Sequence, residues 1–412
     1  MTTRRSLFRN SLLGGMGLGL PQTGLANIGS TPNVIFITCF GGWDATRTLY
    51  PAFDNPIVDM EGQAERWSIG NLQLVDHPQR PALRHFFQSN HHRTSLIHGI
   101  LSPSVSHQAC LQLMRTGFPT GHPDWPTLLA RELFFDAPIP HLGISGDVFA
   151  GLHSDLLTRM GQGKLLASLL DDSLFEWSDI VLGGVDAQLI IAEQEVRLRR
   201  MGRLAESANS DVFQSMMSAA ARAQYLKERH QLIDWESDGS LLGDCLLAVD
   251  VLEQGISPCI SIGHSALWDS HSNNEVYQHW LWEELFSALA VLFEELDLRQ
   301  GSAMDGNSGM TLAEQTTVIV LSEMGRAPRL NSSLGKDHWP YTSAMIIGER
   351  LQESRVYGGY GANFQGLPID LNSGELFSGG QHLSVQHFGS SILQLFGLDG
   401  ADLLDGTEAL LL

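Results

Sequence analysis

Three features are scarce in this 412-residue chain: cysteine, basic side chains and long apolar runs. The four cysteines are widely spaced and form no CxxC pair, which argues against a zinc knuckle and against a dense disulfide framework. Lys and Arg number 25 against 46 Asp and Glu, a net charge of −21, so nucleic acid is not expected as a partner. Beyond the N-terminus no stretch approaches the roughly 20 apolar residues of a membrane span, so we expect no transmembrane segment in the mature chain.

The N-terminus has the layout of an export signal. A charged start is followed by a short, glycine-diluted apolar stretch at 11–20 and a small-residue cleavage site at 24–26. The pair Arg4-Arg5, followed by Ser-Leu-Phe, is typical of a twin-arginine (Tat) signal, which exports folded proteins. We therefore predict a Tat-type signal over 1–29, contact with the Tat translocase during export, and a periplasmic mature protein. A Sec signal or a basic tail before a surface helix is the alternative.

Short β-branched apolar runs alternate with amphipathic segments of helical period along the rest of the chain. Such alternation predicts an α/β protein with a mostly parallel sheet and helices on both faces. No Pro/Ser-rich linker divides the chain, so we expect one domain over 30–412 with a helical insertion around 186–236. The expected strands are 33–40, 94–98, 259–262, 316–321 and 343–347, and the main expected helices are 108–114, 126–133, 241–253, 275–297 and 385–396.

Acidic and imidazole side chains recur just after the predicted strands. Open α/β sheets place their ligand crevices at the carboxyl ends of the strands, so these side chains are expected to converge. Mixed carboxylate and imidazole ligands suit a hard or borderline divalent cation. Zinc and manganese are the first candidates, and magnesium and calcium stay open. The candidate metal ligands are Asp44, Asp269, His271, Glu323, Asp337 and His338, with Ser106 and His107 as candidate catalytic residues.

Each of these residues also has an ordinary structural interpretation. An isolated aspartate such as Asp44 commonly caps a helix, and Ser106 could cap the helix that follows it. An isolated histidine is usually a polar group with its hydrogen bonds satisfied. The joint position of all these residues behind buried strands is what favours a metal centre.

Five motifs resemble those of the DUF1501 family of Tat-exported proteins, within the alkaline phosphatase/sulfatase superfamily. They are FGGWD (40–44), SHQACLQLMRTG (106–117), WDSH (268–271), SEMGRAP (322–328) and GKDHWP (335–340), in the family's order. The resemblance implies an alkaline-phosphatase-like three-layer αβα sandwich with metal ligands on strand-end loops.

Position by position, the resemblance assigns Asp44 to the first metal aspartate of the superfamily. Asp269 and His271 match the aspartate-histidine pair of the second cluster, and His338 matches the last histidine ligand. Glu323 departs from the pattern, because many members carry an Asp-His pair there. The stretch VSHQACL also departs from the CxPSR-like context of a sulfatase nucleophile.

The sequence leaves the nucleophile open between Ser106, His107 and a water. Serine becomes a competent alkoxide once a metal or base takes its proton. We favour His107 as a ligand, Ser106 as an N-cap and water as the attacking group. The expected function is an exported, metal-dependent hydrolase of a small anionic phosphate or sulfate ester. The alternative is a catalytically inactive relative that binds an anion or stabilises a cell-envelope assembly.

Overall fold

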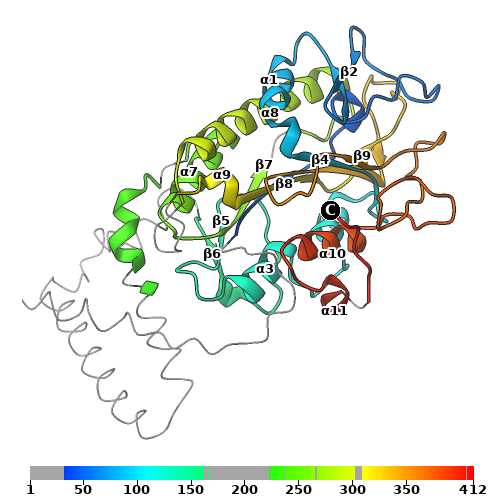
Figure 1. Ribbon diagram of the computed structural model, residues 1–412. Coiled ribbons are helices and arrows are strands. Elements are labelled where there is room, and N and C mark those ends of the chain that lie inside the picture. The colour runs from blue at the N-terminus through cyan, green and yellow to red at the C-terminus, as the bar shows by residue number, and fades with distance from the viewer. Residues whose placement is uncertain are drawn as a thin grey trace, which may run out of the picture.

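A computed structural model describes residues 32–161, 166, 222–223, 225–235, 237–264, 267–301, 309–404 and 406–412. Its centre is an eight-stranded sheet (Figure 1). The strands are β1 (Asn33–Cys39), β4 (Thr94–Leu101), β5 (His141–Gly143), β6 (Leu157–Arg159), β7 (Cys259–His264), β8 (Thr316–Ser322), β11 (Tyr341–Ile347) and β12 (Val356–Gly358). Their order is β12-β4-β11-β8-β1-β7-β5-β6. All five strands expected from the sequence are present.

One strand of this sheet runs against the others. β11 pairs antiparallel with both β4 and β8, whereas the other pairings are parallel. The carboxyl ends of β1, β4, β7 and β8 therefore lie at the same edge as the start of β11. Loops from five separate parts of the chain meet at this edge.

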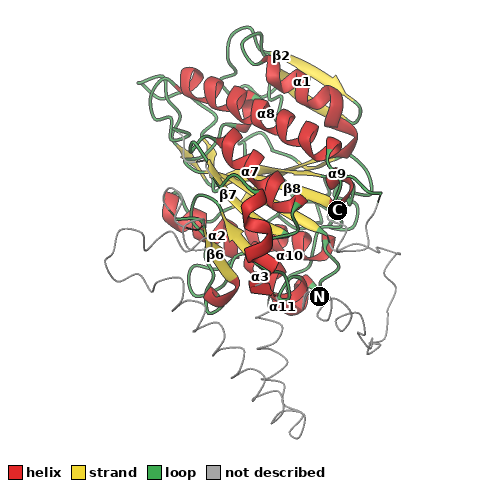
Figure 2. Ribbon diagram, turned by 90° about the vertical axis from the view of Figure 1, so that its left-hand side faces the viewer, coloured by secondary structure: helices red, strands yellow, loops and turns green. Residues whose placement is uncertain are grey.

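Helices cover both faces of the sheet (Figure 2). Successive β1 side chains point to opposite faces: Ile35 and Ile37 pack into one apolar core, and Val34 and Phe36 into another. The first core is covered by α1 (Pro81–Asn90), α7 (Leu241–Glu253), α8 (Asn274–Leu298) and α9 (Leu312–Gln315). The second is covered by α2 (His107–Thr116), α3 (Trp125–Leu133), α10 (Val385–Leu395) and α11 (Gly400–Leu403). The predicted three-layer αβα sandwich around a mostly parallel sheet is confirmed.

Smaller elements decorate this frame. The hairpin β2 (Glu65–Ile69)–β3 (Leu72–Asp76) was not expected from the sequence, nor was the two-residue ribbon β9 (Gly325–Arg326)–β10 (His338–Trp339). The 3-10 helices are η2 (Ala45–Arg47), η3 (His91–Arg93), η4 (Ser154–Leu156) and η6 (His230–Leu232). All four cysteines are free and buried.

Two sequence predictions fall largely on residues outside the described part. These are the export signal over 1–29 and the helical insertion around 186–236, of which only 222–223 and 225–235 are described. Across the described ranges, no helix has both the length and the apolar character needed to cross a bilayer.

Candidate metal centre

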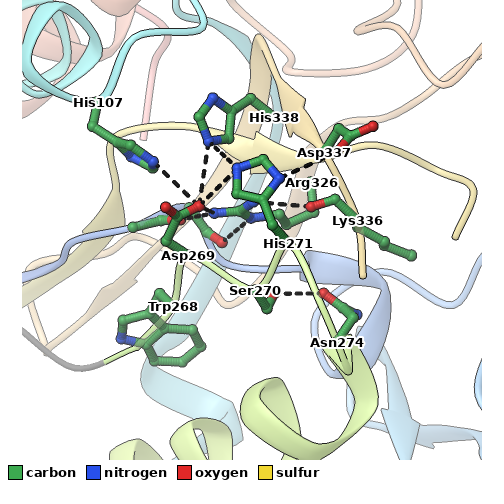
Figure 3. Close-up of polar contacts among 12 residues, drawn as sticks. His107, Trp268, Asp269, Ser270, His271, Asn274, Arg326, Lys336, Asp337 and His338 are labelled. Carbon is green, nitrogen blue, oxygen red and sulfur yellow. Dashed lines mark hydrogen bonds and ion pairs between the residues drawn. The ribbon is translucent and has the colours of Figure 1, made fainter. Parts of the chain in front are cut away.

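Three strand-end loops bring imidazole and carboxylate groups together (Figure 3). His107 opens α2 after β4, whereas Asp269 and His271 follow β7. His338 lies in β10, immediately before antiparallel β11, so its loop reaches the same edge from the opposite chain direction. Gly41, with φ +121°, permits the close approach, because a Cβ there would lie 2.6 Å from the Asp269 backbone nitrogen.

Asp269 lies at the centre of three imidazole rings. Its Oδ1 is 3.3 Å from His107 Nε2, 3.2 Å from His271 Nε2 and 3.3 Å from His338 Nε2. The Nε2 atoms of His271 and His338 are themselves 2.8 Å apart. His107, Asp269 and His338 each offer one ligand atom, and these atoms lie within 4.8 Å of one another. Nε2 is thus the ring nitrogen that faces the centre in all three histidines.

The other nitrogen of each ring contacts an oxygen that accepts hydrogen bonds. His107 Nδ1 lies 2.7 Å from Glu323 Oε1, and His338 Nδ1 lies 2.7 Å from the carbonyl oxygen of Val105. An ionised carboxylate or a carbonyl has no proton to give, so Nδ1 carries the proton and donates it. This tautomer leaves the Nε2 lone pair of both rings directed at Asp269.

His271 follows the same rule, because its Nδ1 lies 3.2 Å from Asp337 Oδ1. Its Nε2 therefore meets that of His338 at 2.8 Å, a contact that needs either a proton shared between the two nitrogens or a metal ion bound by both. His107 Nε2 is buried and has no hydrogen-bond partner. Three imidazole nitrogens and one carboxylate oxygen form a donor set suited to zinc and compatible with manganese, whereas magnesium and calcium prefer oxygen ligands.

Glu323 lies behind His107, away from the shared centre. Its fully buried carboxylate accepts hydrogen bonds from the backbone nitrogens of Gly41 (2.9 Å) and Gly42 (3.3 Å). The hydrogen bond that His107 donates to Glu323 raises the pKa of His107, against the opposing effect of burial. Glu323 therefore orients the His107 ring and does not itself face the cluster of imidazoles.

Asp44 lies in a separate, closed network. Its Oδ2 is 2.8 Å from Lys336 Nζ and 3.2 Å from Arg47 Nε, and it accepts a hydrogen bond from Asn274 Nδ2 at 3.0 Å. Its Oδ1 accepts from the Thr46 nitrogen, which caps η2. Burial by itself would raise the pKa of Asp44, but Lys336 and Arg47 hold it well below the usual range. The structure does not bring Asp44 into the cluster of imidazoles.

Ser106 occupies the N-cap position of α2, where the sequence placed it, but its side chain makes no capping hydrogen bond. Within the described residues, no serine, threonine or cysteine side chain hydrogen-bonds to Asp269 or to the three imidazoles. Asp337 is exposed and contacts His271 at the rim of the centre.

Arg326, a basic residue that the sequence did not indicate, holds the loops of the site together. Arg326 Nη2 donates to Asp269 Oδ1 at 2.6 Å and to the Gly41 carbonyl, and Nη1 donates to the Lys336 carbonyl at 2.9 Å. Partial burial would raise the pKa of Asp269, but Arg326 lowers it to about 2. Arg326 and Lys336 lie inside the SEMGRAP and GKDHWP motifs, and neither is a usual metal ligand, so a search for ligands passes over them.

Comparisons with solved structures find distant likenesses. One is the crystal structure of Ps i-CgsB in complex with k-i-k-neocarrahexaose, with 10% identity and a TM-score of 0.35, covering 92% of this chain and 75% of that chain. Another is PsFucS1 sulfatase from Pseudoalteromonas sp., with 11% identity and a TM-score of 0.35, covering 93% and 70%. No curated protein matches. Residues 185–408 match the family described as "Protein of unknown function (DUF1501)", and the chain belongs to that family.

Proposed function

We propose that this protein is a metal-dependent hydrolase of phosphate or sulfate esters. His107, His271, His338 and Asp269 would hold one divalent cation, with zinc as the first candidate. The observation that carries the proposal is the convergence of three Nε2 lone pairs on one carboxylate oxygen. When bound, such a cation supplies positive charge to the non-bridging oxygens of an ester and lowers the pKa of a bound water or hydroxyl.

The surrounding residues support these ligands in definite ways. Glu323 fixes the tautomer and ring orientation of His107, the role that carboxylates commonly play behind metal-binding histidines. Arg326 fixes Asp269 and keeps it ionised at neutral pH. Because Arg326 also binds the Gly41 and Lys336 carbonyls, it joins the loops after β1 and β8 to the loop after β7.

The attacking group in this proposal is a water. The lack of a hydroxyl or thiol hydrogen-bonded to the cluster, across the part of the chain that is described, supports this choice over a serine nucleophile. His107 is assigned as a ligand, since its Nε2 faces Asp269 and its Nδ1 is committed to Glu323.

The test combines metal analysis with an ester screen on purified protein. We expect about one divalent cation per chain and hydrolysis of a phosphate monoester, phosphate diester or sulfate ester that is lost on chelation. His338→Ala should lose both metal and activity, whereas His85→Ala, which removes an exposed histidine on α1, should keep both. Protein without metal would contradict the proposal. Metal without turnover of any ester would point instead to an anion-binding or cell-envelope protein.

We also propose export by the Tat pathway, supported by the Arg4-Arg5 leader, which lies outside the described residues. Replacing both arginines with lysine should leave the precursor in the cytoplasm, as measured by cell fractionation. An unchanged periplasmic yield, or export in cells that lack the Tat translocase, would refute this part.

A further inference from the structure

Three exposed apolar residues stand on the loops that carry the proposed metal ligands. Val105, Leu267 and Leu334 are 52%, 60% and 62% exposed. Val105 and Leu267 each lie two residues before a proposed ligand, His107 and Asp269. The Val105 carbonyl also accepts the hydrogen bond that His338 Nδ1 donates. The backbone at Val105 and Leu267 is therefore held close to the cluster by the loops that carry its ligands.

Leu334 is placed beside His271 by close backbone packing. It forms an antiparallel bridge with Ser272, and a side chain on the next residue, Gly335, would collide with the His271 carbonyl group. Leu334 has φ +57°, a left-handed conformation that glycine and asparagine adopt more readily than leucine. An exposed leucine at such a position gains little from burial, so its side chain is better explained by a ligand than by folding.

Two further exposed apolar residues lie on α8, whose first turn is joined to Leu334. The Asn274 nitrogen donates to the Leu334 carbonyl at 2.8 Å, which fixes the start of the helix against this loop. Val276 and Trp280 follow at helical spacing on one face of α8 and are 68% and 53% exposed. We define the apolar strip as Val105, Leu267, Leu334, Val276 and Trp280. It holds five of the fourteen exposed large apolar side chains of the described residues, and such gatherings mark binding surfaces.

We propose that the substrate is an amphiphilic ester, whose phosphate or sulfate group lies at the metal centre and whose alkyl or aryl group lies along the apolar strip. This inference rests on the proposed hydrolase function. It is supported by continuity, because three of the five side chains stand on the loops that form the centre. A strongly polar ester group would gain nothing from these side chains.

Charge argues against an anionic membrane surface as the occupant. Anionic lipid surfaces attract clusters of Lys and Arg, whereas this chain carries a net charge of −21. The strip itself contains no basic residue. A single anionic group is instead accommodated by the cation expected at the centre.

The test is a calorimetric titration of purified, metal-loaded protein with n-alkylphosphonates from methyl to decyl. Each methylene that lies on the strip should tighten binding by up to about fourfold. Leu334→Asn, Val276→Thr and Trp280→Gln should bring the ratio of methyl to decyl Kd toward one; asparagine tolerates the left-handed backbone at 334. Leu298→Gln, which changes a still more exposed apolar residue at the far end of α8, should keep the wild-type ratio.

A Kd that does not depend on chain length, or a ratio unchanged in the three variants, would overturn the inference. Binding to zwitterionic lipid vesicles, or self-association, that is lost in the same variants would assign the strip to a membrane or to a second copy and would also overturn it. If no ester is hydrolysed, the proposed function fails, while the phosphonate titration still decides whether an amphiphile binds here.

Discussion

Asp44 and Asp269 are two carboxylates in equivalent places with different surroundings. They follow β1 and β7, which are neighbouring parallel strands, so both reach the same edge of the sheet. The Asp44 side chain is 1% exposed and closed in by Lys336 and Arg47. The Asp269 side chain is 46% exposed and has three imidazole nitrogens around one oxygen.

The difference lies in what the neighbours offer. An ammonium and a guanidinium only donate, so they neutralise Asp44 and use its oxygens. Asp269 also has a guanidinium partner, Arg326 at 2.6 Å, but the imidazoles around it have their protons on Nδ1 and direct their lone pairs toward the same carboxylate oxygen. A strand-end position brings a carboxylate to the edge, but the neighbouring donors and lone pairs decide whether it can bind a cation.

The largest effect is expected from Asp44→Asn. The substitution leaves the ammonium of Lys336 buried without its partner, and breaking a buried ion pair costs about 3–5 kcal/mol. Urea unfolding in the presence of a chelator measures this cost without a contribution from metal. Combining Asp44→Asn with Lys336→Met should cost less than the sum of the two single changes. A loss below about 1 kcal/mol would show that the pair is not a closed structural unit.

Asp269→Asn should act on the metal. Bound cation stabilises the folded state by about 2.7 kcal/mol at a hundredfold excess over Kd, and that contribution should disappear with the ligand. In this variant the melting temperature should no longer respond to a chelator. Asp44→Asn should retain its metal. If Asp44→Asn lost the metal and Asp269→Asn kept it, Asp44 and not Asp269 would be the metal ligand.

Glu323→Gln should weaken metal binding without removing a ligand. Loss of the charged partner behind His107 is expected to reduce affinity about 10–100-fold, as measured by competition with a chromophoric chelator. Asp337→Asn is the matched control. The Asp337 carboxylate is 66% exposed, so solvent weakens its interaction with His271. An equal loss of metal affinity in both variants would contradict the claim that the buried carboxylate of Glu323 matters more than the exposed one of Asp337.

Acid unfolding should separate the two aspartates in metal-free protein. The pKa of Asp44 is lower in the folded protein than its value of about 3.9 in the unfolded chain. Ionised Asp44 therefore stabilises the folded state above that pH, and this stabilisation is lost as the pH falls. A single group accounts for at most about 1.4 kcal/mol per pH unit. Asp44→Asn should flatten the fall in stability below pH 4 or so more than Asp269→Asn does, because solvent reaches Asp269. An identical slope in both variants would argue against the closed network.

Ser106→Ala should have the smallest effect. Replacing a serine that caps a helix costs about 1 kcal/mol of folding stability. Ser106→Ala should cost less, because the Ser106 side chain makes no capping hydrogen bond. Activity should be retained, whereas His107→Ala should abolish it. Loss of turnover with unchanged metal content, or a phosphoserine trapped at 106, would identify Ser106 as the nucleophile and refute the water mechanism.

The fold could be predicted well from local patterns. The continuous apolar run at 33–40 predicted β1, and the helical period at 241–253 gave α7 with its bounds. The antiparallel direction of β11 and the two-residue β9–β10 ribbon could not be predicted, because pairing across the sheet leaves no local signal in such short segments.

The site was predictable by residue type but not by partner. Ligand-type residues after strands led to His107, Asp269 and His338, which the fold does bring together. The same reasoning gave Asp44 equal weight, because the sequence does not reveal that Lys336 neutralises it. That ion pair joins residues almost 300 positions apart. Contacts of that kind depend on the folded sheet edge, and no spacing in the sequence records them.

The most direct test of the metal centre is anomalous diffraction from crystals of the zinc-loaded protein. The account predicts one strong peak within about 2.0–2.2 Å of Nε2 of His107 and His338 and of a carboxylate oxygen of Asp269. His271 should supply the remaining ligand, and Lys336 should stay paired with Asp44. A peak beside Asp44, or zinc-loaded crystals with no peak among the three histidines, would contradict the central claim.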